Sequence, residues 1–266
     1  MRRYALMGAS SFFLLVFVYI TILRPTLSPF VALPELPGGH GTSTLIFLLV
    51  SLFHALHALG WRHTLIFFTL STAISWAFEQ VGVATGAIYG PYHYTDVLGI
   101  KLGHVPVLIP LAWFMMIYPS YVIANLIADG QPIGTRGGLM RVVWLALLGA
   151  MIVTAWDLVM DPFMSGAQMQ AWVWEQGGDY FGVPVQNFWG WLLTTFTVYL
   201  AYRLWERRSK PRPASPLSLP IAALPVLAYS SMLIPYVISV EAGPLRVIAT
   251  FAMGLPVIAA IGRLPH

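Results

Sequence analysis

Long apolar stretches recur along the whole chain and constrain its fold more than any other feature of the sequence. A helix that crosses a bilayer needs about 20 consecutive, mostly apolar residues. Eight stretches approach this length: residues 5–23, 42–59, 64–81, 106–127, 139–160, 188–204, 217–240 and 245–261. The pattern predicts an all-α, polytopic membrane helical bundle of about eight transmembrane helices, in a single membrane domain over residues 1–266.

The composition agrees with this interpretation and excludes several classes of protein. Hydrophobic residues make up 58% of the chain and charged residues 9%, against about 45–50% and about 25% in a soluble domain. So few charges cannot cover the surface of a soluble enzyme, and so many apolar residues exclude a disordered chain. The count of 0 cysteines excludes disulfides, thiolate metal sites, iron–sulfur clusters and cysteine nucleophiles.

The first apolar stretch has two interpretations. Arg2 and Arg3 precede it, as in a signal peptide. However, the stretch is long for a signal peptide, and it ends at Arg24 and Pro25 without a small-residue cleavage site. We therefore expect a retained helix.

The C-terminal helical pair, residues 209–266, is the other region where alternatives remain. Pro220, Pro225 and Pro235 predict that the seventh helix is kinked or broken. The last stretch is short and contains Gly254 and Pro256. A bundle of seven helices is therefore the alternative.

The distribution of charge predicts the orientation in the membrane. With eight spans, 11 of the 14 basic residues lie on the side of the N-terminus, including the cluster at residues 203–212. Because basic residues concentrate in cytoplasmic loops, both termini are predicted to be cytoplasmic.

The acidic residues show the opposite distribution, although acidic residues contribute little to topology. Eight of the ten lie on or near the opposite face: Glu35, Glu79, Asp96, Asp157, Asp161, Glu175, Asp179 and Glu241. A functional site at that face is one explanation.

Three of these carboxyl groups lie within predicted helices or at their ends. Glu79 is near the end of the third apolar stretch, where a charge is costly unless it has a role. Asp157 and Asp161 are four residues apart and therefore face the same side of one helix. Two carboxylates this close in a low dielectric cannot both ionise easily, so one of them is expected to serve as a general acid. The alternative is that all three are interfacial carboxylates that reach water.

Two aromatic segments follow these helices. Glycines at every fourth position from Gly82 to Gly90 allow close approach of backbones. The same segment contains three tyrosines shortly before Asp96: Tyr89, Tyr92 and Tyr94. The segment from Trp172 to Trp191 is rich in aromatic residues and glycine and has no lysine or arginine, so we expect it to fold back as a cap over a site. The alternative for both segments is an aromatic belt at the membrane surface.

The histidines give little support for a metal site. His54 and His57 share a helix face, but the predicted topology places them at the cytoplasmic end, away from the acidic residues. The chain also has no Gly-x-Ser-x-Gly and no His-Glu-x-x-His sequence, so neither a serine hydrolase nor a zinc protease is indicated. We therefore predict no bound metal.

Several blocks of the sequence resemble the integral-membrane carotenoid biosynthesis family, which includes the carotenoid 1′,2′-hydratases of bacteria and the bisanhydrobacterioruberin hydratases of haloarchaea. The blocks are Glu79-x-x-Gly82-x-x-Thr85-Gly86-x-x-Tyr89-Gly90-x-Tyr92-x-Tyr94, Leu98-Gly99-x-x-Leu102, Val105-Pro106-x-x-Ile109-Pro110-x-x-Trp113, Asp157-x-x-Met160-Asp161-Pro162, Trp172-x-Trp174 and Tyr180-Phe181-Gly182-Val183-Pro184-x-x-Asn187-Phe188-x-Gly190-Trp191. They occur in the family's order over about residues 42–208. The resemblance implies hydration of the terminal isoprenoid double bond of a linear carotenoid end group, without a cofactor. The implied partners are a lycopene-, γ-carotene- or bisanhydrobacterioruberin-like carotenoid, water, membrane lipid and other enzymes of carotenoid synthesis, and no nucleic acid.

This activity suits the residues present. Hydration of an unactivated alkene needs a strong acid, a shielded tertiary cation and a positioned water. The candidates for proton transfer are Glu79, Asp157, Asp161 and Asp96. The candidates for binding the substrate and shielding the cation are Trp76, Tyr89, Tyr92, Tyr94, Trp113, Trp174, Tyr180, Asn187 and Trp189.

Two other functional classes remain as alternatives. A transporter or ion-coupled carrier also uses intramembrane carboxylates and broken helices. It would be expected to contain a second, inverted copy of the acidic segment, and no such copy is visible in the sequence. A non-catalytic carotenoid-binding protein would need the aromatic residues but not the carboxylates.

Overall fold

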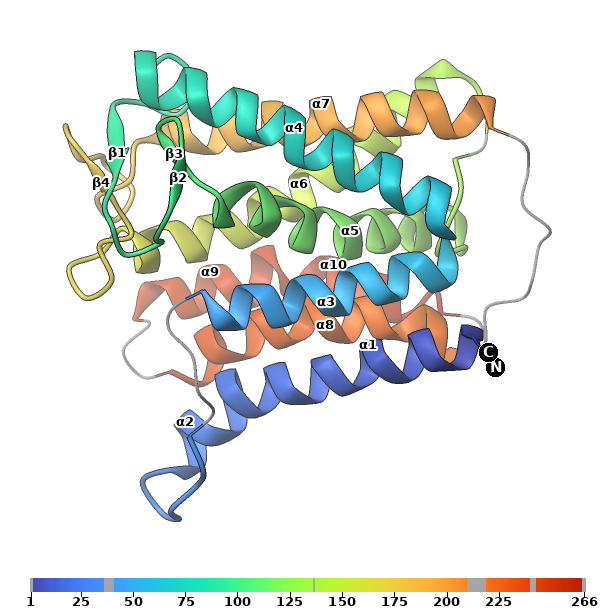
Figure 1. Cartoon of the computed structure of the whole chain (residues 1–266), viewed down its shortest axis with the longest axis horizontal. Helices are drawn as coiled ribbons and strands as arrows, with labels where there is room; N and C mark the ends of the chain where they lie inside the picture. Colours follow the sequence, from blue (N-terminus) through green and yellow to red (C-terminus); the bar gives the residue numbers. More distant parts are fainter. Residues whose placement is uncertain (1, 36–40, 136, 210–218, 240–242, 265–266) are drawn as a thin grey trace.

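The computed structural model describes residues 2–35, 41–135, 137–209, 219–239 and 243–264. Arg136, Lys210, Arg212 and Glu241, which contribute to the predicted charge distribution, lie outside the described residues. The helices run side by side along the longest axis of the molecule (Figure 1). The predicted all-α helical bundle is therefore confirmed.

The helices follow the predicted apolar stretches closely. The first is α1 (Arg2–Val18), which continues through a π-helical turn, η1 (Tyr19–Leu23), into α2 (Arg24–Leu27). The others are α3 (Thr42–Ala58), α4 (Trp61–Thr85), α5 (Leu108–Asp129), α6 (Leu139–Met164), α7 (Val185–Arg208), α8 (Leu219–Ile238), α9 (Pro244–Ala252) and α10 (Gly254–Ile261).

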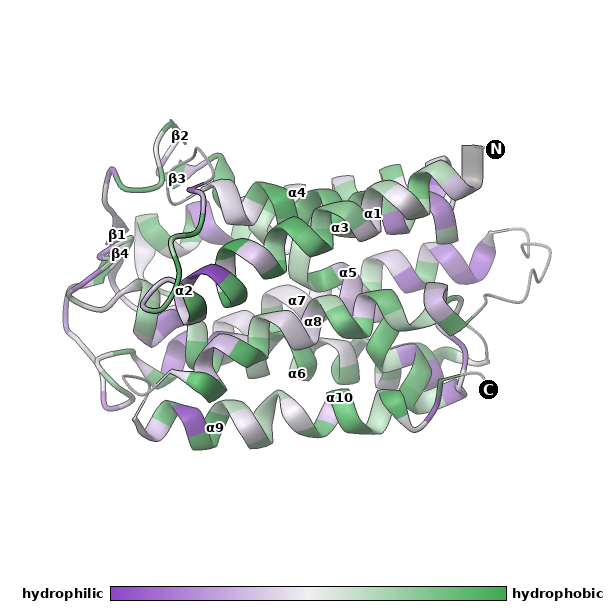
Figure 2. Ribbon diagram, turned by 90° about the horizontal axis from the view of Figure 1, so that it is seen from below, coloured by the Kyte–Doolittle hydropathy of each residue, from purple (hydrophilic) through white to green (hydrophobic). Residues whose placement is uncertain are grey.

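Five helical segments are long and apolar enough to cross a membrane: Tyr4–Leu27, Trp61–Thr85, Leu108–Asp129, Leu139–Met164 and Pro244–Ile261. Two further helices, Thr42–Ala58 and Ala222–Ile238, are apolar but shorter. Figure 2 shows hydrophobic residues along the middle of the helices and hydrophilic residues mostly gathered at the two ends of the bundle. This distribution is that of a membrane protein.

The prolines of the C-terminal pair predicted a helix that is kinked or broken, and the structure excludes a break. The helix α8 continues through Pro225 and Pro235 rather than breaking at either residue. A proline removes only one intrahelical hydrogen bond, and α8 packs against α5, α9 and α10, which support the rest of the helix. The interruption falls instead between α9 and α10, at Met253 and Gly254, so that the last predicted span consists of two short helices.

Two small antiparallel sheets cover one end of the bundle. Strand β1 (Tyr92–Tyr94) pairs with β4 (Trp172–Trp174), and β2 (Lys101–Leu102) pairs with β3 (Val105–Pro106). The segments that follow α4 and α6 therefore meet above the helix ends, on the left in Figure 1. The helix α1 begins and α10 ends at the opposite end of the bundle.

Candidate active site

Glu79 belongs to a buried stripe along α4. The buried residues of this helix recur every three or four positions, which is one face of an α-helix: Thr64, Phe67, Ser71, Ser75, Glu79 and Gly82. Most of these side chains are small, so α4 lies close to its neighbours. The same periodicity that buries Phe67 therefore turns Glu79 into the bundle, where only 4% of the residue is exposed.

Three neutral donors hold the Glu79 carboxyl group. The hydroxyl groups of Tyr92 and Tyr94 both donate to Oε2, the second at 2.8 Å. The indole Nε1 of Trp113 donates to Oε1 at 3.1 Å. The two tyrosines can share one partner because side chains two apart on a strand point to the same face, while His93 between them points outward and is exposed.

The two tyrosines are fixed as donors by their surroundings. Burial, and then the charge of Glu79, raise the pKa of both Tyr92 and Tyr94 well above the ordinary value. Both phenols therefore keep their hydrogens over the whole physiological range of pH. Each hydrogen is then available to the Glu79 carboxyl group.

A second carboxyl cluster is formed by α6 and α7. Asp157 and Asp161 lie one helical turn apart, and the side-chain amide of Asn187 at the start of α7 donates to both, at 2.9 Å to Asp157 Oδ2 and 2.8 Å to Asp161 Oδ2. The indole groups of Trp172 and Trp174 donate to Asp161 Oδ1, each at 3.0 Å. Both aspartates are enclosed, with 0% and 1% of the residues exposed.

The pairing of β1 with β4 brings the two clusters together. Tyr92 lies opposite Trp174 and Tyr94 lies opposite Trp172. The rings of Tyr92 and Trp174 are 4.9 Å apart between centroids, within the range of a favourable aromatic contact. The strand that supplies donors to Glu79 therefore packs directly on the strand that supplies donors to Asp161.

Glycines allow Tyr89 to fit between α4 and α7. A Cβ atom at Gly82 would lie 2.5 Å from the Tyr89 ring, and one at Gly190 would lie 2.4 Å from it. Both distances are too short for any larger residue. The hydroxyl group of Tyr89 forms a hydrogen bond of 2.7 Å with Thr194 of α7, which fastens the two helices beside the site.

A cavity of about 680 Å³ lies against these groups. Glu79, Asp161 and Asn187 line it, together with a group of aromatic side chains: Tyr89, Tyr92, Tyr94, Trp113, Trp156, Trp172, Trp174 and Trp191. It extends across the bundle to Thr21 of η1, the start of α3 and the end of α8. A mostly apolar cavity lined by a few polar groups is typical of a binding site.

Five of the predicted site residues are not among those that line the cavity: the fully enclosed Asp157, and four others that lie outside the two carboxyl clusters. Trp76 donates to the carbonyl group of Leu102 at 3.2 Å, and Tyr180 donates to the carbonyl group of Leu158 at 2.9 Å. Trp189 is 67% exposed on the outer face of α7.

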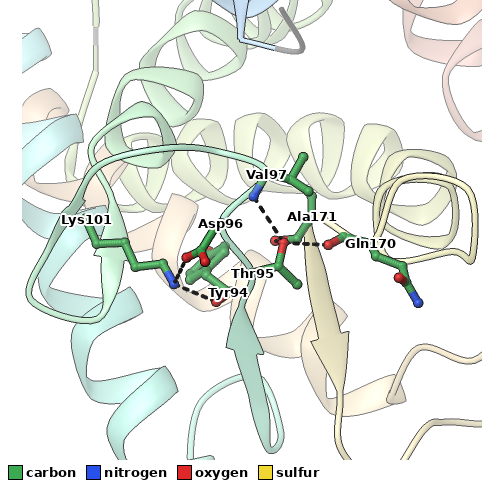
Figure 3. A network of polar contacts seen from close by, with 7 residues as sticks. All are labelled: Tyr94, Thr95, Asp96, Val97, Lys101, Gln170 and Ala171. Atoms are coloured by element: carbon green, nitrogen blue, oxygen red, sulfur yellow. Dashed lines mark hydrogen bonds and ion pairs between the residues drawn. The ribbon is translucent and has the colours of Figure 1, made fainter.

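Asp96 is the fourth, and it lies on the outside of the loop. Its side chain is fully exposed and forms an ion pair with Lys101 at 3.3 Å. Figure 3 shows that Lys101 also donates to the backbone carbonyl group of Tyr94, at 2.8 Å. In the same view, Thr95 donates to the carbonyl groups of Gln170 and Ala171, which ties the loop after β1 to the segment before β4.

Aromatic residues outside the predicted set also line the cavity. Trp191 stacks on Trp113 with ring centroids 3.9 Å apart, and Trp156 lies 5.9 Å from Trp191. Helical spacing was the signal that could have found Trp191, because it is four residues after Asn187 and shares its face. Strand alternation could likewise have found Trp172 beside Trp174.

In the described part of the chain, no three His, Asp or Glu side chains are grouped so as to hold a metal ion. The imidazole Nδ1 of His54 instead forms a 2.6 Å hydrogen bond with the hydroxyl group of Tyr118. The site therefore offers carboxyl groups, phenols, indoles and one amide. These groups can transfer protons and surround an apolar ligand.

Fold and site together define a class: helical membrane proteins in which carboxyl groups face an aromatic cavity inside the bundle. The family model described as carotenoid biosynthesis protein matches residues 39–259. Because the match covers most of the chain, this protein belongs to the carotenoid biosynthesis protein family, as the sequence blocks predicted.

One curated relative has a more specific name. The chain is 33% identical over 132 residues to the bisanhydrobacterioruberin hydratase of Haloarcula japonica. The aligned part is 49% of this chain and 42% of that protein, so the chain matches less than half of the relative's length. No solved structure matches the chain.

Proposed function

We propose that this protein is a carotenoid 1′,2′-hydratase of the cell membrane, which adds water across the terminal isoprenoid double bond of a linear carotenoid to give a tertiary alcohol. The family and the name of the relative support the substrate class. The observation that carries the proposal is that two carboxyl groups, Glu79 and Asp161, line the same aromatic cavity. A hydration needs one group to give a proton and another to accept one.

The reaction requires no change of oxidation state. One carboxyl group gives its proton to the less substituted carbon of the double bond, and the positive charge develops on the more substituted carbon. The oxygen of a water molecule then bonds to this tertiary carbon, and its excess proton passes to the second carboxyl group. The sum is the addition of one water, and the proton returns from the second carboxyl group to the first, directly or through water, before the next turnover.

The aromatic lining stabilises the charged intermediate. The face of an indole or phenol ring attracts a nearby cation by about 0.5–2 kcal/mol, and the attraction is strongest in a site without water. Trp113 and Trp191 present such rings beside Glu79. The apolar remainder of the cavity suits a polyene, which has no polar group of its own to pair.

The test is expression in cells that accumulate lycopene or γ-carotene, followed by mass analysis of the pigments. The expected result is a gain of one water per reacting end group, as a tertiary alcohol. The matched control is Asp161→Asn, which keeps the shape of the side chain. Unchanged pigment in cells that contain the inserted wild-type protein and the substrate would overturn the proposal. A non-catalytic carotenoid-binding protein would give bound but unaltered pigment.

A further inference from the structure

Asp157 differs in position from the other two carboxyl groups of the site. Glu79 and Asp161 line the cavity, whereas Asp157 is not among the described residues that do so. It is fully enclosed, with 0% of the residue exposed. Asp157 therefore lies behind the cavity wall and reaches the site only through its neighbours.

Its hydrogen bonds also differ in number. Glu79 accepts from three donors, and Asp161 accepts from two indoles and one amide. Asp157 accepts from Asn187 alone, and its Oδ1 has no hydrogen-bond partner in the described part of the chain. An ionised carboxylate with one donor in an enclosed site would be an uncompensated charge, whereas a carboxyl group that keeps its hydrogen has a smaller need for donors.

The described groups that interact electrostatically with Asp157 supply no positive charge. They are Asp161 from the same helix, Glu79 from α4, Tyr89 from the turn after α4, Tyr180 from the loop before α7 and Tyr236 from α8. All five are acids.

Asn187 links Asp157 to the cavity. It gives one side-chain nitrogen to both aspartates, so the bond to Asp157 fixes how the amide is turned toward Asp161. Without Asp157, the amide would keep only its bond to Asp161, and its orientation toward Asp161 would be less well fixed.

We propose that Asp157 is a positioning residue that keeps its hydrogen and acts through Asn187, while proton exchange with the substrate is carried out by Asp161 and Glu79. This assignment rests on the hydratase function proposed above. The sequence alone makes Glu79, Asp157 and Asp161 equal candidates for proton transfer, and this assignment separates their roles.

The first test compares Asp157→Asn with Asp157→Leu and Asp161→Asn. An asparagine amide has the shape of a carboxyl group with its hydrogen, so Asp157→Asn is expected to keep kcat within about threefold of the wild type, whereas Asp157→Leu loses about 30-fold through the misplaced amide. Asp161→Asn is expected to lose about 100-fold or more, as for a group that transfers a proton. Asp157→Asn that is folded, binds carotenoid and is as inactive as Asp161→Asn would overturn the proposal.

The second test asks whether Asp157 acts through Asn187. If it does, the double variant Asp157→Leu with Asn187→Leu is expected to have about the same kcat as Asn187→Leu alone. The pH profile of Asp157→Asn is also expected to coincide with that of the wild type, because a group that never ionises in turnover cannot shape the profile. A loss of kcat in the double variant equal to the product of the two single losses would contradict the assignment. A shifted pH profile of activity in Asp157→Asn would contradict it as well.

A third measurement does not depend on turnover. The infrared C=O stretch of a carboxyl group that holds its hydrogen is expected in the wild type and in Asp161→Asn, and its intensity is expected to fall in Asp157→Asn. A band that persists in Asp157→Asn and disappears in Asp161→Asn would overturn the assignment. A wild-type protein that hydrates no carotenoid, but whose band loses intensity in Asp157→Asn, would overturn the proposed function while leaving the state of Asp157 established.

Discussion

The bundle contains two buried polar clusters, at opposite ends, and they are built on different principles. At one end Glu79, Asp157 and Asp161 are held by neutral donors beside a cavity. At the other end the fully buried Arg203 of α7 donates to Asn125 at 2.9 Å and to Thr135 at 3.0 Å, and its guanidinium group lies 4.5 Å above the ring of Tyr121.

The second cluster contains its own countercharge. Glu206 accepts hydrogen bonds from Tyr121 at 2.7 Å and from Thr135 at 2.5 Å, and Thr135 is also a partner of Arg203. Acid and base are therefore joined through shared partners, which lowers the cost of burying Arg203 beside the half-buried Glu206. The first cluster places three acids together without a base among the contacts described above, which costs stability. The comparison indicates that the Arg203 cluster holds α7 against α5, and it agrees with the catalytic role that we propose for the acidic cluster.

The largest expected effect is that of Glu79→Gln. The amide keeps the size of the side chain but cannot exchange a proton, so hydratase activity should fall by about 1,000-fold, within the range of general acid–base catalysis. Pigment analysis in lycopene-producing cells measures the activity, and thermal unfolding in detergent measures stability. Because the substitution removes an acid that has no countercharge, stability should be unchanged or higher. A large loss of stability with retained activity would mean that Glu79 serves the fold and not the reaction.

Arg203→Leu should give the opposite result. Removal of the base deletes the hydrogen bonds from Arg203 to Asn125 and Thr135 and takes the positive charge away from the half-buried Glu206, so the free energy of unfolding should fall by about 2 kcal/mol. Activity per folded molecule should stay within about twofold of the wild type, since Arg203 is far from the cavity. Chemical or thermal unfolding measured beside activity checks both statements. Inactive but stable protein would show that the two ends of the bundle are coupled.

The pair Trp191→Ala and Trp189→Ala sharpens the description of the cavity. Trp191 lines it and stacks on Trp113, so its loss should lower kcat by about tenfold through weaker shielding of the cation. Trp189 is exposed on the other side of the same helix, and its truncation should change kcat by less than about twofold. Equal effects of the two variants would mean that the ring stacking beside Glu79 has no role in the reaction.

The smallest effect is expected at the far side of the cavity. Thr21 lines the cavity from η1 and lies outside the residues matched by the family model. Thr21→Trp should partly fill the cavity and raise KM by about threefold to fivefold with little change in kcat, as for lost uniform binding. Leu15→Trp, at a site 69% exposed on the same helix, is the control and should behave as the wild type. An unchanged KM for Thr21→Trp would show that the substrate does not reach η1.

The sequence predicted the elements of this protein well but not all of their consequences. The apolar stretches located the helices because a membrane helix satisfies its own backbone and needs only length and hydrophobicity. The continuity of α8 through Pro225 and Pro235 could not be read in the same way, since it depends on the helices packed around it. The position of Trp189 illustrates the same limit, because an aromatic-rich segment does not reveal which ring faces inward until the phase of the helix is known.

What the sequence by itself determined is a helical membrane protein of the carotenoid biosynthesis family with a short set of carboxyl and aromatic residues, because these follow from local hydrophobicity and from motifs of neighbouring residues. What only the tertiary structure decided is how those residues are grouped. The pairing of Tyr92 with Trp174, and the amide of Asn187 between Asp157 and Asp161, join segments that are 26 to 82 positions apart in the chain. Hydrogen bonding depends on distance and direction in space, and those were set by the packing of α4, α6 and α7 and by the small sheet above them.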